Sequence, residues 1–151
     1  MKTVYDLWFE LLTVEGQEHV RLAQALTLDE SRPLLGLKGT NGLFGSDEWW
    51  MNIRSGRIPT RVVEGVIHDM AFAGQDARWG DEVNELSLRL PDGSFLSESI
   101  YTNDTKDRAL FKPGAEIRIV YALDELKRMS AGQGNAMSEI VLEMAIGRLS
   151  S

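Results

Sequence analysis

The chain has 151 residues, a formal net charge of -7 and 43% hydrophobic residues, which predicts one soluble domain large enough to bury a core. It contains no cysteine and two histidines, which excludes disulfides, thiolate metal sites, cysteine nucleophiles and any site with three histidine ligands. No apolar run approaches the roughly 18 residues of a membrane span, and Asp6 and Glu10 interrupt the N-terminal segment, so we expect a cytoplasmic protein.

The segment from about residue 4 to residue 28 alternates apolar and polar positions. Its apolar members are Leu7, Phe9, Leu11, Val20, Leu22, Leu26 and Leu28. A period of two is typical of a strand with one buried face, and Glu15-Gly16-Gln17 can turn, so we predict a β-hairpin over 4–28. The alternative is a helix, because alanine, leucine, glutamine and glutamate all favour helices.

A glycine-rich run at 36–45 precedes a segment with the signals of a short helix. The run lacks the ending of a phosphate loop and the spacing of the dinucleotide fingerprint, so we interpret it as a loop that lets the chain cross the sheet. Ser46 can cap a helix that has two acids in its first turn and Arg54 in its last, and Gly56 can terminate it. We predict about two turns of helix, which need the adjacent tryptophans to pack on the sheet.

Further strand patterns cover about 60–72, 84–90, 94–101, 115–123 and 139–147. Pro91-Asp92-Gly93 predicts a tight turn, because proline fixes one turn dihedral and glycine supplies a positive φ. The segment 139–147 also fits a short helix, and a second helix is expected at about 104–111. Small polar residues at 130–136 predict a flexible loop.

These patterns together predict a mainly β fold. We expect a single domain over 1–151, with about seven antiparallel strands in a barrel or a sandwich and one or two short helices. One-sided alternation is the pattern that an antiparallel sheet with one solvated face requires. The choice between barrel and sandwich, and the strand order, stay open.

The sequence carries no constellation specific to one catalytic chemistry. His68-Asp69 lies in a predicted strand, where neighbouring side chains point to opposite faces, and His19 has no local partner. The acids near Trp79 lack the spacing of a calcium loop, so we expect no metal and no cofactor. Paired carboxylates beside tryptophans also suit a small hydrolase or carbohydrate-active domain, which is the alternative hypothesis.

The residues that need a further explanation are tryptophans, arginines and acids. As candidates for contact with a partner we select Trp49, Trp50, Arg54, Arg57, Arg61, Trp79, Asp81 and Glu82. Tryptophan and arginine are enriched at the energetic centres of interfaces. The simpler interpretation is that Arg54, Arg57 and Arg61 balance nearby acids and that the tryptophans belong to the core.

The negative charge disfavours nucleic acid and anionic membranes and favours a basic protein partner. We therefore expect a non-catalytic binding module, and in one specific form an acidic inhibitor or immunity-type protein that masks a basic toxin or nuclease. A subunit of a homo-oligomer, in which one strand edge pairs with its copy, is a third hypothesis.

Overall fold

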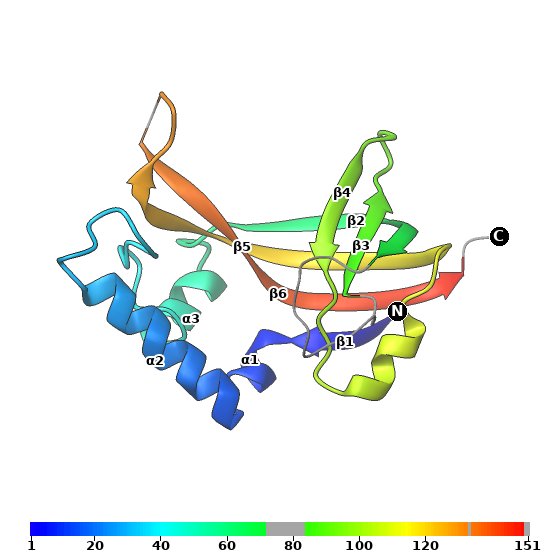
Figure 1. The fold of residues 1–151 in the computed structure, drawn as a ribbon, viewed down its shortest axis with the longest axis horizontal. Helices are drawn as coiled ribbons and strands as arrows, with labels where there is room; N and C mark the ends of the chain where they lie inside the picture. The colour runs from blue at the N-terminus through cyan, green and yellow to red at the C-terminus, as the bar shows by residue number, and fades with distance from the viewer. Residues whose placement is uncertain (72–83, 133, 150–151) are drawn as a thin grey trace. The chain divides into compact units, whose positions relative to one another are not determined.

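The computed structural model describes residues 1–71, 84–132 and 134–149. Six strands form one sheet in the order β1-β6-β5-β2-β3-β4 (Figure 1). The strands are β1 (Lys2–Asp6), β2 (Thr60–Ala71), β3 (Glu85–Arg89), β4 (Phe95–Ser99), β5 (Ala115–Met129) and β6 (Asn135–Leu149). The helices are α1 (Leu7–Glu10), α2 (Val14–Leu28), α3 (Asp47–Arg54) and the 3-10 helix η2 (Thr105–Leu110). The predicted mainly β, antiparallel class is confirmed, and the sheet ends at β1 and β4 instead of closing into a barrel.

The chain packs as two compact units. The sheet unit comprises Met1–Asp6, Val62–Ile119 and Glu143–Ser151, and the helical unit comprises Leu7–Arg61 and Val120–Leu142. The long strands β5 and β6 contribute residues to both units. The single-domain organisation stays a prediction.

The sheet unit buries the apolar positions that the alternation indicated. Leu86 and Leu88 of β3 and Ile67 of β2 are buried in their antiparallel pairing. The turn between β3 and β4 forms as predicted, because Gly93 has a φ of 87° and the Leu90 N–H donates to the Ser94 carbonyl at 2.8 Å.

The predicted hairpin over 4–28 is wrong, because only β1 is a strand there and α1 and α2 follow it. Thr13 caps α2 by accepting a hydrogen bond from the Gly16 N–H at 3.0 Å, so Gly16 lies in the first helical turn and not in a β-turn. The alternation was misleading because Leu22 and Leu28 of α2 are exposed and do not mark a buried face. The intrinsic helix preference of the segment prevails.

The described part of the chain from Thr60 onward follows the predicted elements closely. The segment 139–147 is part of strand β6, η2 lies within the expected 104–111, and β2 begins at Thr60. Between β5 and β6, the Ser130 N–H donates to the Gly134 carbonyl at 2.9 Å. The flexibility of 130–136 stays a prediction, and the end of the predicted strand at residue 72 lies outside the described residues.

Strand β5 extends six residues beyond its predicted end at residue 123, because the glycine-rich loop pairs with it. Leu37 and Leu126 form an antiparallel bridge, the Lys38 N–H donates to the Glu125 carbonyl at 2.9 Å, and the Lys127 N–H donates to the Gly36 carbonyl at 2.9 Å. The buried positions along β5 also shift by one residue. Ile119 and Tyr121 are buried on odd positions, and Ala122 and Asp124 are then buried on even positions. A buried carboxylate therefore lies inside the helical unit.

Candidate partner-binding site on the helical unit

Helix α3 forms from the local signals that predicted it. The Ser46 hydroxyl accepts a hydrogen bond from the Trp49 N–H at 3.2 Å, acids occupy the first turn, Arg54 lies in the last turn, and Gly56 has a φ of 82°. The two adjacent tryptophans point to different sides of this helix, because neighbouring residues on a helix are about 100° apart. Trp49 is buried and Trp50 is half-buried.

The inner face of α3 carries Trp49, whose side chain is 0% exposed. Its indole N–H donates to the Oδ2 atom of Asp124 at 2.9 Å, and its ring lies edge-on to Phe44 with the centroids 5.0 Å apart. Burial raises the pKa of the Asp124 carboxyl, and the hydrogen bonds from Trp49 and from the Glu125 N–H lower it in part. Trp49 is thus a core residue that joins α3 to β5 through a buried polar pair.

Asp124→Asn is expected to remove a pH dependence of stability. Because the pKa of Asp124 is raised in the folded protein above the value of about 3.9 in the unfolded chain, the folded state binds the proton more tightly. The free energy of unfolding of the wild type therefore declines as pH rises from the unfolded pKa to the folded pKa. Urea denaturation across this range should show the difference between the variant and the wild type growing with pH. A difference independent of pH would contradict the assignment.

The outer face of α3 consists of Asp47, Trp50, Met51 and Arg54, at helical spacings of three and four. Trp50 is half-buried, and Met51 and Arg54 are exposed. Trp8 of α1, which is also exposed, packs edge-on against Trp50 with the ring centroids 5.3 Å apart. The structure thus places two predicted contact residues, Trp50 and Arg54, on one face. It adds Trp8, which a helical interpretation of the first segment would have indicated.

The arginine cluster is divided by the structure. Arg57 is exposed beyond the end of α3. Arg61 forms an ion pair with Glu139 at 3.1 Å, and its guanidinium lies 5.5 Å from the centre of the Tyr121 ring. Because Glu139 is distant in sequence, no local pattern indicates this pairing. Arg61 on β2 therefore contacts side chains of β5 and β6, and it is not only a positive charge available to a partner.

The other candidates, Trp79, Asp81 and Glu82, form one of the two acid and tryptophan clusters of the hydrolase hypothesis and lie outside the described residues. The other cluster is Asp47 and Glu48 beside Trp49 and Trp50 on α3, where Trp49 is buried. Within residues 1–71, 84–132 and 134–149, no group of three histidines or acids could hold a metal ion. No helix in these ranges is long and apolar enough to cross a membrane. His19 and His68 are exposed and lie beside the rings of Phe44 and Phe95.

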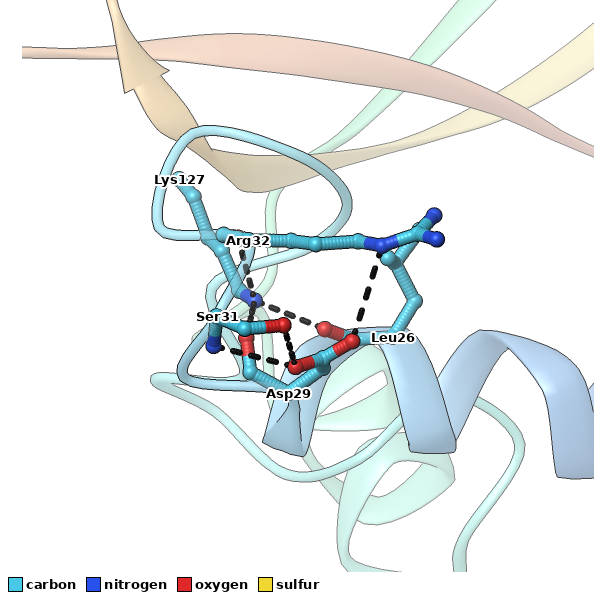
Figure 2. Close-up of polar contacts among 5 residues, drawn as sticks. All are labelled: Leu26, Asp29, Ser31, Arg32 and Lys127. Atoms are coloured by element: carbon cyan, nitrogen blue, oxygen red, sulfur yellow. Dashed lines mark hydrogen bonds and ion pairs between the residues drawn. The ribbon is translucent and has the colours of Figure 1, made fainter.

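A second exposed surface of the helical unit is the loop after α2, which displays Leu34 and Leu35. The Lys127 ammonium of β5 holds this loop, as Figure 2 shows, by donating to the carbonyls of Leu26 at 2.7 Å, Asp29 at 3.3 Å and Arg32 at 3.2 Å. A lysine has three N–H donors, so each finds one carbonyl. The positive charge also lies at the C-terminal end of α2, where the helix dipole favours a cation.

Lys127→Met is expected to destabilise the protein by about 2 kcal/mol, because three carbonyls lose a charged donor and the end of α2 loses its cation. Chemical denaturation of the variant measures this loss. The matched control is Lys38→Met, since the Lys38 ammonium is exposed and, in the part of the chain that the structure describes, contacts the Asn135 and Glu125 side chains. The control should change the free energy of unfolding by less than about 0.5 kcal/mol. Equal losses in the two variants would contradict the role of Lys127.

The helical unit therefore has the properties of a protein-binding module: large apolar side chains are exposed on helices and loops that polar contacts hold in place. The sequence matches the immunity protein RhsI2 family over residues 1–147, so the chain belongs to this family. The prediction of an immunity-type protein is therefore confirmed at the level of the family. A comparison with curated proteins finds no match.

Proposed function

We propose that the protein binds a Rhs toxin and blocks it by forming a stoichiometric complex, without catalysis. The match to the immunity protein family over nearly the whole chain carries this proposal. The net charge of -7 supports a partner with a basic surface, because opposite charges speed association and orient the two proteins. We also propose that the complex forms in the cytoplasm.

The outer face of α3, extended by Trp8, is the surface that we propose contributes to this contact. Trp50 is already ordered by its ring contacts with Trp8 and Trp49, so little side-chain freedom is lost on binding. Arg54 on the same face, with Arg57 beyond the helix end, can pair with carboxylates of the partner. Trp49 supports this face from beneath through its hydrogen bond to Asp124, and Arg61 lies on β2, paired with Glu139.

A titration tests the proposed function. Toxin activity is measured while the purified protein is added, and full inhibition is expected at equimolar amounts, with a complex of matching size by light scattering. Inhibition at far lower ratios would indicate catalysis and favour the hydrolase hypothesis. Absence of both a complex and inhibition would refute the proposal.

Met51→Ala tests the α3 face against a matched control. Met51 and Met129 are exposed to nearly the same extent, 63% and 62%, but only Met51 lies on α3. We expect Met51→Ala to weaken the complex by about tenfold and Met129→Ala to leave it unchanged, as measured by calorimetry. If both variants bind like the wild type, the contact lies on another surface.

A further inference from the structure

The junction between α1 and α2 leaves large apolar side chains in solvent. Trp8 is 42% exposed, Phe9 61%, Leu12 63% and Val14 83%. We call the segment from Trp8 to Glu18 the α1–α2 corner. Single exposed apolar residues are common, but four within seven positions form the kind of surface that marks an interaction site.

The backbone of the α1–α2 corner is held by side-chain hydrogen bonds and by close packing at Gly16. The Thr13 hydroxyl donates to the Glu10 carbonyl at 2.7 Å and accepts from the Gly16 N–H at 3.0 Å, and the Gln17 side-chain amide donates to the Leu11 carbonyl. Gly16 packs directly on the preceding chain, since an added Cβ would lie 1.9 Å from the Glu10 carbonyl oxygen. The apolar side chains are thus displayed on a preformed backbone, which lowers the entropy cost of binding.

The charges of the α1–α2 corner all have one sign. Glu10, Glu15 and Glu18 lie within it, and no lysine or arginine occurs from Thr3 to Val20. The first cation after this stretch is Arg21, which forms an ion pair with Glu18. An apolar surface with carboxylates around it is complementary to an apolar pocket rimmed by basic side chains.

The α1–α2 corner is continuous with the outer face of α3. Trp8 belongs to the corner and packs against Trp50 of α3, with the ring centroids 5.3 Å apart. A partner that covers the α3 outer face can therefore also reach the corner without a gap. The corner contributes apolar area, and the α3 face contributes an aromatic ring and Arg54.

We propose that the α1–α2 corner is the main anchor of the toxin contact, and that it inserts into an apolar pocket of the toxin rimmed by lysine or arginine side chains. This inference rests on the proposed function. It specifies the chemistry of the partner surface, which membership in the family does not give. A second copy of the chain is the competing occupant, and it is an outcome of the test.

The apolar arm of the test compares Phe9→Ser/Leu12→Ser with Phe95→Ser. Phe95 on β4 is 56% exposed and lies in the sheet unit, so it controls for the loss of an exposed ring. Binding of the toxin domain is measured by calorimetry, and thermal unfolding verifies that all variants fold. The double variant should bind at least about 100-fold more weakly, and Phe95→Ser within about threefold of the wild type.

The charge arm compares Val14→Arg with Val14→Glu, which remove the same apolar side chain and differ in sign. Val14→Arg should slow association by about tenfold at low salt relative to Val14→Glu, and the difference should shrink at high salt. Equal association rates for the two variants would refute the proposed basic rim of the toxin pocket.

The possible failures can be distinguished. If the wild type binds no toxin, the proposed function fails. If it binds and Phe9→Ser/Leu12→Ser binds equally well, the function stands and the α1–α2 corner is not the anchor. If the wild type self-associates in light scattering and the double variant does not, the corner is a self-contact and the inference is wrong.

Discussion

Trp49→Phe is expected to lower the free energy of unfolding by about 3 kcal/mol at a pH where the Asp124 carboxyl is ionised. Phenylalanine can occupy most of the space beside Phe44, but it has no N–H for the buried Asp124 carboxylate, which is 2% exposed. A buried charge that loses its partner costs more than an ordinary hydrogen bond. The loss should be smaller at a pH where Asp124 is protonated in both states, because a neutral carboxyl needs the donor less. Urea denaturation at both pH values measures it.

Two variants separate this effect from simple loss of ring volume. Trp50→Phe on the outer face should cost less than about 1 kcal/mol, since its indole is half-buried and lies at the surface. In an Asp124→Asn background, Trp49→Phe should cost about 1–2 kcal/mol less than in the wild type, because no charge is left unpaired. Equal costs in the two backgrounds would show that packing, and not the polar pair, explains the stability.

Gly16→Ala is expected to destabilise the protein by about 3 kcal/mol, although alanine is the better helix former by about 1 kcal/mol. The added Cβ would meet backbone atoms at 1.9 Å from the Glu10 carbonyl oxygen and 2.7 Å from the Leu11 Cα, and backbone atoms cannot rotate away. The start of α2 must therefore shift from the end of α1. Thermal unfolding measures the change, and a stabilised variant would refute the close packing.

The control for this prediction is Gly56→Ala. Gly56 has a positive φ of 82° but no heavy atom near the position of an added Cβ. Its substitution should cost about 1 kcal/mol, from the left-handed backbone alone. The comparison therefore separates steric overlap at Gly16 from backbone strain at Gly56.

Elements with strong signals inside the segment were predicted well. Helix α3 has its cap, its charged turns and its terminating glycine within eleven residues. The hairpin of β3 and β4 has Pro91-Asp92-Gly93 between two alternating runs. In both cases the signals that start, end or turn the element lie a few positions apart, so a local pattern contains the information.

The first 28 residues were predicted wrongly because their strongest features are ambiguous in isolation. Gly16 serves as a turn residue in many chains, but here the close approach of Glu10 requires it. The leucines of α2 mimic a strand because the helix exposes Leu22 and Leu28 and buries only Gly16 among its residues. Because its apolar side chains do not mark one buried face, α2 lacks the burial period that identifies a helix.

The sequence alone was sufficient for the mainly β antiparallel class, for α3, for the turn at residues 91–93 and for the immunity-type hypothesis from charge and composition. The packing of distant segments determined the rest. The indole of Trp49 meets Asp124 75 residues away, and Lys127 meets the carbonyl of Leu26 101 residues away. Such pairs form only when the strands are in register, and their energy depends on burial. Local propensity determines neither the register of the strands nor the burial of a side chain. The buried partners and the exposed faces were therefore visible only in the folded chain.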